Sequence, residues 1–184
     1  MGFWIVLALA VLIGLYAIAT FNGLVTRRNR VKNAWAQIDV QLKRRHDLIP
    51  NLVNTVKGYL QHEREVLEKV TTARQQAIAA GSDVTGRAAA ENMLTQAMRS
   101  LFAVVESYPE LKSSHNMLAL QEELSSTENK VAFARQFYND SVMEYSTACE
   151  SFPGNVFARS FGFAPEAAFA LEDAAQRAVP QVQF

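Results

Sequence analysis

Three histidines and one cysteine are the side chains of this 184-residue chain best suited to transition-metal binding or acid–base chemistry. A di-iron centre in a helical bundle needs two Glu-x-x-His pairs and further carboxylates from facing helices. None of the histidines, His46, His62 and His115, has a glutamate three positions before it. His-Glu-x-x-His, Cys-x-x-Cys and the glycine-rich loops that hold nucleotide phosphates are also absent. We therefore expect neither a metal site nor a cofactor site.

The single cysteine, Cys149, would need a neighbouring histidine to act as a nucleophile. It lies instead on an apolar helical stripe, which predicts a small core residue. One cysteine also excludes an intramolecular disulfide, which is compatible with a reducing compartment. We expect no catalytic residue. An enzyme of unknown type is the weakest functional hypothesis, because it would need a polar cluster in a pocket.

Four charged residues lie on helical stripes that are otherwise apolar: Arg45, Glu63, Glu128 and Arg135. A buried charge is costly unless it is paired, so we expect Glu–Arg pairs across the core of the fold. A polar layer of this kind would fix helix register, and these residues are therefore candidates for a polar core or for assembly. The alternative is that each stripe is wide enough for the charged groups to reach solvent.

These residues lie on segments in which apolar side chains recur every three or four positions, the spacing of amphipathic helices. The expected helices cover residues 23–47, 50–80 and 87–105, and a fourth ends near residue 151. On the fourth, the stripe runs from Leu118 to Phe152 over about five heptads, which is typical of a coiled coil. Short connections favour antiparallel neighbours. The sequence therefore predicts an all-α fold, an elongated, up-down antiparallel bundle of about four helices.

Three local signals set the expected helix ends. Pro50 disfavours helical geometry at the preceding residue and predicts a bend or a new helix start. Residues 81–86 (GSDVTG) form the clearest loop. Ser107 and Glu110 have the spacing of a capping box, in which the Ser107 hydroxyl accepts from the Glu110 backbone N–H. Pro109 then falls where a helix has no N–H to lose.

Residues 1–26 contain no charged side chain, and residues 3–21 form a predominantly apolar run. At about 1.5 Å per residue the run covers about 28 Å, close to the thickness of a bilayer's hydrocarbon core. The alternative is a cleaved signal peptide, since residues 17–19 (AIA) have the spacing of a cleavage site. However, no basic residue precedes the run, which is longer than a usual signal-peptide core. We expect an uncleaved transmembrane helix, continuous with the first bundle helix.

The balanced charge of 18 basic and 18 acidic residues hides an asymmetry and gives no support to nucleic-acid binding. Four basic residues follow the apolar run directly: Arg27, Arg28, Arg30 and Lys32. The positive-inside rule then places the N-terminus outside and the C-terminal domain in the cytoplasm. The same residues could bind anionic lipid head groups, or they could only set the topology.

The tail, residues 152–184, holds six of the eleven phenylalanines, a composition unlike that of disordered chains. It could fold back onto its own bundle, pack on a neighbouring subunit or touch the bilayer. The candidates for such docking are Phe157, Phe161, Phe163 and Phe169. Pro165 could open a short helix that continues to about residue 179. The expected parts are an anchor (1–26), a helical bundle (27–151) and this Phe-rich tail.

Several stretches in this chain resemble the LemA family. They are residues 33–45 (NAWAQIDVQLKRR), 47–53 (DLIPNLV), 62–63 (HE), 106–112 (ESYPELK), 120–124 (LQEEL), 127–129 (TEN), 134–139 (ARQFYN), 152–153 (FP) and 161–163 (FGF). They occur in order and with the spacing of that family from about residue 21 to residue 163, and residues 164–184 lie outside the resemblance. The resemblance implies a bacterial membrane-anchored helical bundle with a short outside N-terminus and a cytoplasmic body. It implies no reaction. Relatives are tied to the formation of membrane organelles or occur alongside a membrane metalloprotease.

Two functions from different classes fit these features. The first is a non-enzymatic scaffold that self-assembles into a homo-oligomer on the cytoplasmic face of the bacterial inner membrane. The second is an adaptor that regulates another membrane protein, such as a membrane metalloprotease, in envelope quality control. The expected partners are thus the lipid bilayer, further copies of the chain and, in the second case, another membrane protein. These analogies rest on the family and not on a site.

Overall fold

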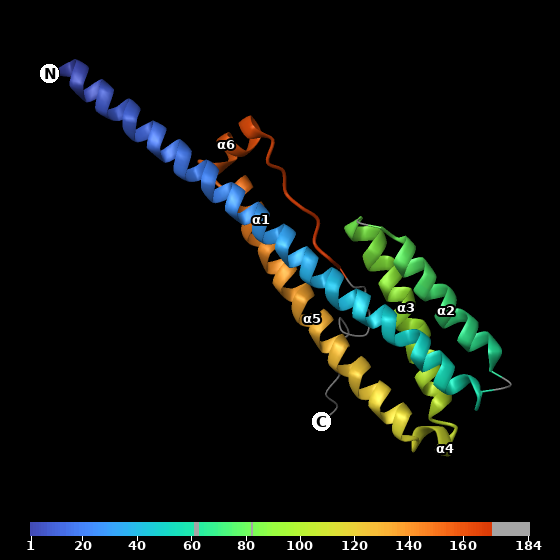
Figure 1. The fold of residues 1–184 in the computed structure, drawn as a ribbon. Helices are drawn as coiled ribbons and strands as arrows, with labels where there is room; N and C mark the ends of the chain where they lie inside the picture. Colours follow the sequence, from blue (N-terminus) through green and yellow to red (C-terminus); the bar gives the residue numbers. More distant parts are fainter. Residues whose placement is uncertain (61–62, 82, 171–184) are drawn as a thin grey trace, which may run out of the picture. The chain divides into compact units, whose positions relative to one another are not determined.

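The computed structural model describes residues 1–60, 63–81 and 83–170, and the regular elements in these ranges are all helices (Figure 1). They are α1 (Gly2–Lys57), α2 (Arg64–Ala79), α3 (Val84–Val105), α4 (Pro109–Lys112), α5 (His115–Glu150) and α6 (Gly154–Phe161). The all-α prediction is confirmed. The apolar N-terminal segment is also continuous with the first bundle helix, because both belong to α1.

The chain divides into two units, and α1 and α5 contribute residues to both. Unit 1 comprises residues 1–41 and 131–168, and unit 2 comprises residues 42–130 with residues 169 and 170. The division into an anchor (1–26), a helical bundle (27–151) and a Phe-rich tail (152–184) stays a prediction.

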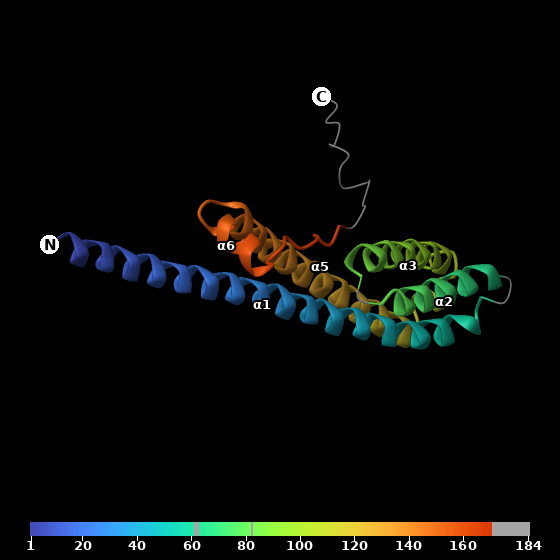
Figure 2. The same ribbon diagram turned by 90° about the horizontal axis from the view of Figure 1, so that it is seen from above.

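In unit 1, α1 and α5 form an antiparallel pair (Figure 2). The Trp35 ring lies 5.3 Å from the Tyr138 ring, and one turn earlier Arg30 bonds to Glu144 at 2.7 Å. The pair buries one stripe of each helix: Leu24, Val31, Ala34 and Ile38 from α1, and Val131, Ala134, Tyr138, Val142, Tyr145 and Cys149 from α5. The prediction that Cys149 is a core residue is confirmed. Burial raises the pKa of its thiol, which leaves it a poor nucleophile.

In unit 2, α2 and α3 form a hairpin joined by a short connection (Figure 1). A single apolar cluster joins this hairpin to the end of α1 and the start of α5. Its fully buried members include Leu52, Val56, Leu60, Val70, Leu94, Leu101, Leu111 and Met117. The expected stripe of the last long helix is wrong at both ends, because Leu118 and Phe152 are exposed. Met117 is buried in place of Leu118, and the chain turns at Ser151–Pro153 before it could bury Phe152.

The predicted new helix start at Pro50 is wrong, because α1 continues through this residue to Lys57. Proline has no N–H and leaves the carbonyl four residues earlier, that of His46, without its helical donor. The Arg74 side chain replaces that donor, with its Nε 2.7 Å from the His46 oxygen. Burial of Leu52 and Val56 holds the following turn in the core. Tertiary contacts therefore override the local preference of proline, and the helix expected at 50–80 is split by a break after Lys57.

Two other predicted boundaries are shifted. Helix α3 starts at Val84 rather than at residue 87, because Asp83 is its N-cap and accepts from the Gly86 N–H at 2.6 Å. The capping box at Ser107 is wrong. Tyr108 occupies the N-cap of α4 without a side-chain cap bond, although Pro109 lies in the first turn as expected. The helix expected from Pro165 does not form in residues 165–170, and the rest of it lies outside the described residues.

Substituting Arg74 with alanine is expected to leave the His46 carbonyl without a donor and to lower the free energy of unfolding by about 1–3 kcal/mol. Pro50→Ala restores a backbone N–H to this carbonyl. The cost of Arg74→Ala should therefore be clearly smaller in the Pro50→Ala background, which a double-mutant cycle by chemical denaturation measures. Equal costs in both backgrounds would show that Arg74 stabilises the fold by another route.

Candidate functional site

A cluster of charged side chains is buried inside unit 2. We call Arg45, His46, Glu91, Thr95 and Glu128 the ion cluster. The cluster draws on three helices: α1 supplies Arg45 and His46, α3 supplies Glu91 and Thr95, and α5 supplies Glu128. The Arg45 side chain is 3% exposed and the Glu91 side chain 2% exposed, so their charges must be compensated within the chain.

Each nitrogen of the Arg45 guanidinium group has a partner at close distance. Its Nη1 donates to Glu91 Oε2 at 3.1 Å, and its Nη2 donates to the Thr95 hydroxyl at 2.8 Å. Its Nε lies 2.7 Å from Glu128 Oε1, in an ion-pair contact that lacks the alignment of a hydrogen bond. One guanidinium thus joins α1 to both α3 and α5.

His46 binds the second oxygen of the same carboxylate, with Nε2 2.7 Å from Glu91 Oε1. An ionised carboxylate only accepts, so Nε2 carries the proton and donates in that state. The backbone oxygen of His46 is the acceptor of Arg74. His46 therefore links α1 to α3 through its ring and to α2 through its carbonyl.

Glu128 is the second carboxylate of the ion cluster, and it lies beside both Arg45 and Arg99. Burial raises the pKa of the Glu128 carboxyl above its ordinary value of 4.5; the Arg45 charge opposes this rise, the Glu91 charge adds to it, and the Arg99 charge also opposes it. The Glu128 side chain is still 44% exposed, so it can exchange protons with solvent.

A pocket of about 560 Å³ opens beside the ion cluster in unit 2. Its lining combines Arg45, Arg99 and Glu128 with apolar side chains of α3 and α5. This is the polar cluster in a pocket that the enzyme hypothesis requires, but its lining contains neither histidine nor cysteine. Within the described ranges, no group of three His, Cys, Asp or Glu side chains is arranged to hold a metal ion. The observed geometry suits a structural cross-link between three helices.

The structure brings only two of the four predicted polar residues together, Arg45 and Glu128. Glu63 lies at the N-cap of α2 without a side-chain cap bond, and Arg135 is half-buried on α5 in unit 1. Sequence reasoning missed Glu91. The signal was present, because Glu91 lies on the stripe of α3 that the fold buries: Ala88, Glu91, Leu94, Met98, Leu101 and Val105. Helical spacing alone predicts a stripe at residues 90, 94, 97, 101 and 104, which is partly out of register with the buried one.

A second candidate site, in unit 1, lies where the apolar run of α1 ends. We call Tyr16, Phe21, Phe157, Phe161 and Phe163 the ring cluster. The Phe157 ring lies 6.3 Å from the Tyr16 ring, and the Phe161 and Phe163 rings lie 5.0 Å and 5.6 Å from the Phe21 ring. The tail thus folds back on its own chain at this point.

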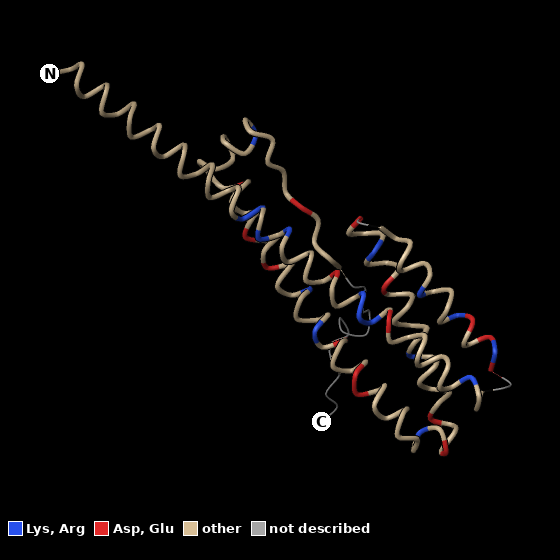
Figure 3. The backbone as a smooth tube through the Cα atoms, in the orientation of Figure 1, with Lys and Arg blue, Asp and Glu red and all other residues tan. Residues whose placement is uncertain are grey.

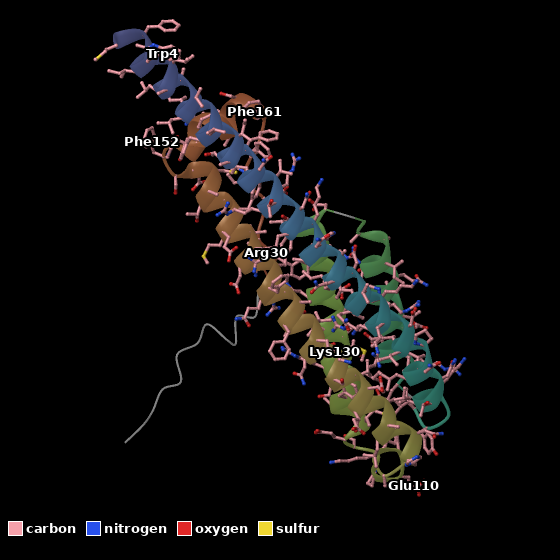
Figure 4. The ribbon with its side chains drawn as sticks, turned by 60° about the vertical axis from the view of Figure 1, so that its left-hand side comes forward. Trp4, Arg30, Glu110, Lys130, Phe152 and Phe161 are labelled. Atoms are coloured by element: carbon pink, nitrogen blue, oxygen red, sulfur yellow. The ribbon has the colours of Figure 1, made fainter. Side chains whose placement is uncertain are left out.

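The docking candidates of the tail differ in exposure. Phe163 and Phe169 are buried, so they are not available to a partner in this arrangement. Phe161 remains 58% exposed and Phe157 half-buried. Figure 4 shows Phe152 and Phe161 beside the stretch of α1 between Trp4 and Arg30.

The basic residues after the apolar run have different surroundings. The Arg28 guanidinium lies over the Phe163 ring at 4.8 Å from its centre, and Arg30 lies over the Phe137 ring at 5.3 Å while it bonds to Glu144. Arg27 donates to the Gly23 carbonyl on its own helix. Lys32 is exposed. Arg28 and Arg30 therefore stabilise unit 1, whether or not they also set the topology.

The N-terminal part of α1 has the length and composition of a membrane span. No Lys, Arg, Asp or Glu interrupts it (Figure 3), and the apolar 18-residue window within α1 has no buried residue. An apolar helical segment whose side chains are not covered by the rest of the chain indicates membrane localisation.

Comparison with known proteins identifies the family. The model of the LemA family matches residues 34–184. The chain belongs to the LemA family. The expectation that the likeness ends near residue 163 is wrong, because the LemA match continues to residue 184, whereas the basic residues 27–32 lie before it.

Curated relatives support this membership. The chain is 25% identical to Protein LemA of Metamycoplasma hominis over 138 residues, which is 75% of this chain and 63% of that protein. It is 23% identical to the Magnetosome protein MamQ of Magnetospirillum gryphiswaldense over 168 residues, which cover 78% of this chain and 62% of MamQ. The chain therefore spans a little under two thirds of the length of these LemA-type relatives.

Removing Glu91 from this LemA-family chain tests the ion cluster. Glu91→Ala leaves Arg45 and His46 without their shared acceptor and is expected to lower the free energy of unfolding by about 3–5 kcal/mol. The matched control is Glu123→Ala, which breaks the exposed 2.7 Å pair with Arg44 in the same unit. It should cost less than about 1 kcal/mol. Chemical denaturation of the solubilised chain measures both, and similar losses would contradict a structural role for the buried pair.

The raised pKa of Glu128 predicts a pH dependence. Its folded-state pKa is raised, so its protonation stabilises the fold at low pH, and this contribution is lost as the pH rises through that pKa. Glu128→Gln has no charge to lose. The stability of Glu128→Gln relative to the wild type should therefore increase as the pH rises above 4.5. Denaturation midpoints from acid to neutral pH measure this change, and a difference that is constant across the range would contradict it.

Proposed function

We propose that this protein is a membrane-anchored, non-enzymatic scaffold that self-assembles into a homo-oligomer on the cytoplasmic face of the bacterial inner membrane. The apolar N-terminal part of α1, which has no buried residue in its 18-residue window, supports a membrane anchor. The basic residues Arg27, Arg28, Arg30 and Lys32 directly after it support the cytoplasmic orientation, since positive charge is retained on that side. The name of one relative, Magnetosome protein MamQ, assigns that protein to a cellular structure rather than to a reaction.

The observation that carries self-assembly is the exposed apolar surface of the α1/α5 pair in unit 1. Two helices can each bury one stripe against the other, so the remaining faces stay open. On these faces Val40 is 63% exposed, Phe133 72% and Met143 62%. Large apolar side chains on open helix faces are typical of protein contact sites.

Phe133 and Met143 lie on one side of α5, with the polar, exposed residues Gln136 and Asp140 between them. These four positions are three, four and three residues apart, the spacing with which helices meet along a seam. The opposite face of α5 carries the seam already used against α1. A second seam on the outer face suits contact with an identical chain, because an anchor holds neighbouring copies at the same height above the membrane and at high local concentration.

The adaptor hypothesis uses the same surface with a different occupant. An outer seam of α5 could bind another membrane protein, such as a membrane protease. The two hypotheses differ in what is extracted with the chain: whole multiples of its own 20.5 kDa mass, or a second polypeptide. Native mass spectrometry of the complex, gently solubilised from its own membranes, distinguishes them.

Charge placed on the outer seam should disrupt the oligomer. In the double variant Phe133→Glu, Met143→Glu, assembly would bury two carboxylates, so the mass distribution should shift to the monomer. The matched control is Met93→Glu on α3, which changes a methionine with 52% exposure in unit 2 and should leave the distribution unchanged. A wild-type chain that is monomeric at high concentration, or an oligomer that survives the double variant, would refute self-assembly through this face.

A further inference from the structure

We propose that α6, together with Phe152, is an interfacial membrane helix. Its exposed apolar side chains, Phe152, Val156 and Phe161, insert into the head-group boundary of the same bilayer that α1 spans. This inference rests on the membrane anchor of the proposed function, but it is independent of self-assembly. It gives the tail of the protein a lipid surface as its partner.

The composition of α6 suits this location. Its eight residues, GNVFARSF, place Val156, Phe157 and Phe161 along one side and Asn155 and Arg159 on another. Interfacial helices combine such an apolar side with a polar or basic side that remains in the head-group layer. The apolar side is only partly used within the chain: Ala158 is buried, whereas Val156 is 55% and Phe152 83% exposed.

The ring cluster fixes the depth of α6 along the span. Phe157 contacts Tyr16, and Phe161 contacts Phe21, the last residue of the apolar run. From residue 16 to residue 21 a helix rises about 7.5 Å. Interfacial helices bury their apolar face to a depth of about 5–10 Å. The tail therefore meets α1 at the height at which such a helix lies.

Two glycines place α6 at this height. A Cβ at position 154 would collide with the Ala148 carbonyl oxygen, so the close return of the chain after α5 requires Gly154. At the other end Gly162 has a φ of 70°, in the left-handed region that favours glycine. There the chain leaves α6 and sets Phe163 against Phe21 and Arg28.

Continuity with the span identifies the occupant as lipid. Each apolar side chain of the span's 18-residue window is unburied, so the bilayer is its solvent. The exposed rings of Phe152 and Phe161 lie beside the end of this segment rather than farther along unit 1 (Figure 4). Arg28 is next to Phe163 in the same cluster, where a cation can meet anionic head groups.

Nitroxide labels on the full-length chain test this inference. The background is Cys149→Ala, which removes the only cysteine. Single labels are placed at Phe152→Cys, Val156→Cys and Phe161→Cys in vesicles of phosphatidylcholine and phosphatidylglycerol. Collisions with oxygen, which concentrates in the bilayer, are compared with collisions with a water-soluble nickel chelate. Leu12→Cys in the span and Ser100→Cys on the exposed side of α3 are the references.

We expect oxygen collisions to exceed chelate collisions at the three tail positions and at Leu12→Cys, with the reverse at Ser100→Cys. If Leu12→Cys lies in the bilayer while the tail labels match Ser100→Cys, the inference is overturned and the anchor stands. Tail labels that are immobile and shielded from both reagents would overturn it in favour of a protein contact. A label at Leu12→Cys that the chelate reaches would overturn the anchor and, with it, this inference.

Discussion

Burial of the Arg45 guanidinium is the constraint on which unit 2 depends. A permanent charge that is 3% exposed is tolerated only if carboxylates meet it from the elements packed around it. Glu91 on α3 and Glu128 on α5 do so, and their positions then fix how far each helix is displaced along α1. An apolar core of leucine, valine and methionine tolerates small shifts in register, whereas a bonded guanidinium does not.

The same stretch of α1 contains a second polar group that needs a partner, the backbone carbonyl of His46, next to the buried Arg45 guanidinium. Pro50 removes a backbone donor from His46, and Arg74 of α2 supplies one at 2.7 Å. His46 uses its ring for Glu91 and its carbonyl for Arg74. Adjacent residues of α1 therefore bind three other helices through polar groups that cannot be left unpaired. This explains how α1 continues through a proline without a cap or a break.

Features that depend on helical spacing could be predicted from the sequence. Features that depend on side-chain contacts between distant helices could not. The stripe of Val31, Trp35, Ile38 and Leu42 follows from helical periodicity alone, and the fold buries all of them except Trp35, which is half-buried. The helix break expected at Pro50 rests on the local preference of proline. The Arg74 side chain overrides this preference because it donates to the His46 carbonyl. Glu91 was missed because a glutamate beside Ala90 looks like the polar edge of a stripe, and only its two bonding partners show that it belongs to the centre.

Unit 1 has two exposed apolar surfaces, one on the outer seam of α5 and one on α6, and they lie at different distances from the end of the membrane span. The contact of Trp35 with Tyr138 sets the register of the antiparallel pair, and the same register brings Val40 to the level of Phe133. Val40 lies 19 positions beyond Phe21 on α1, or about 28 Å along a helix, which is too far for lipid to cover it. Phe161, in contrast, contacts Phe21 itself. Apolar side chains at the end of the span can therefore be satisfied by the bilayer, whereas those on the outer seam need protein.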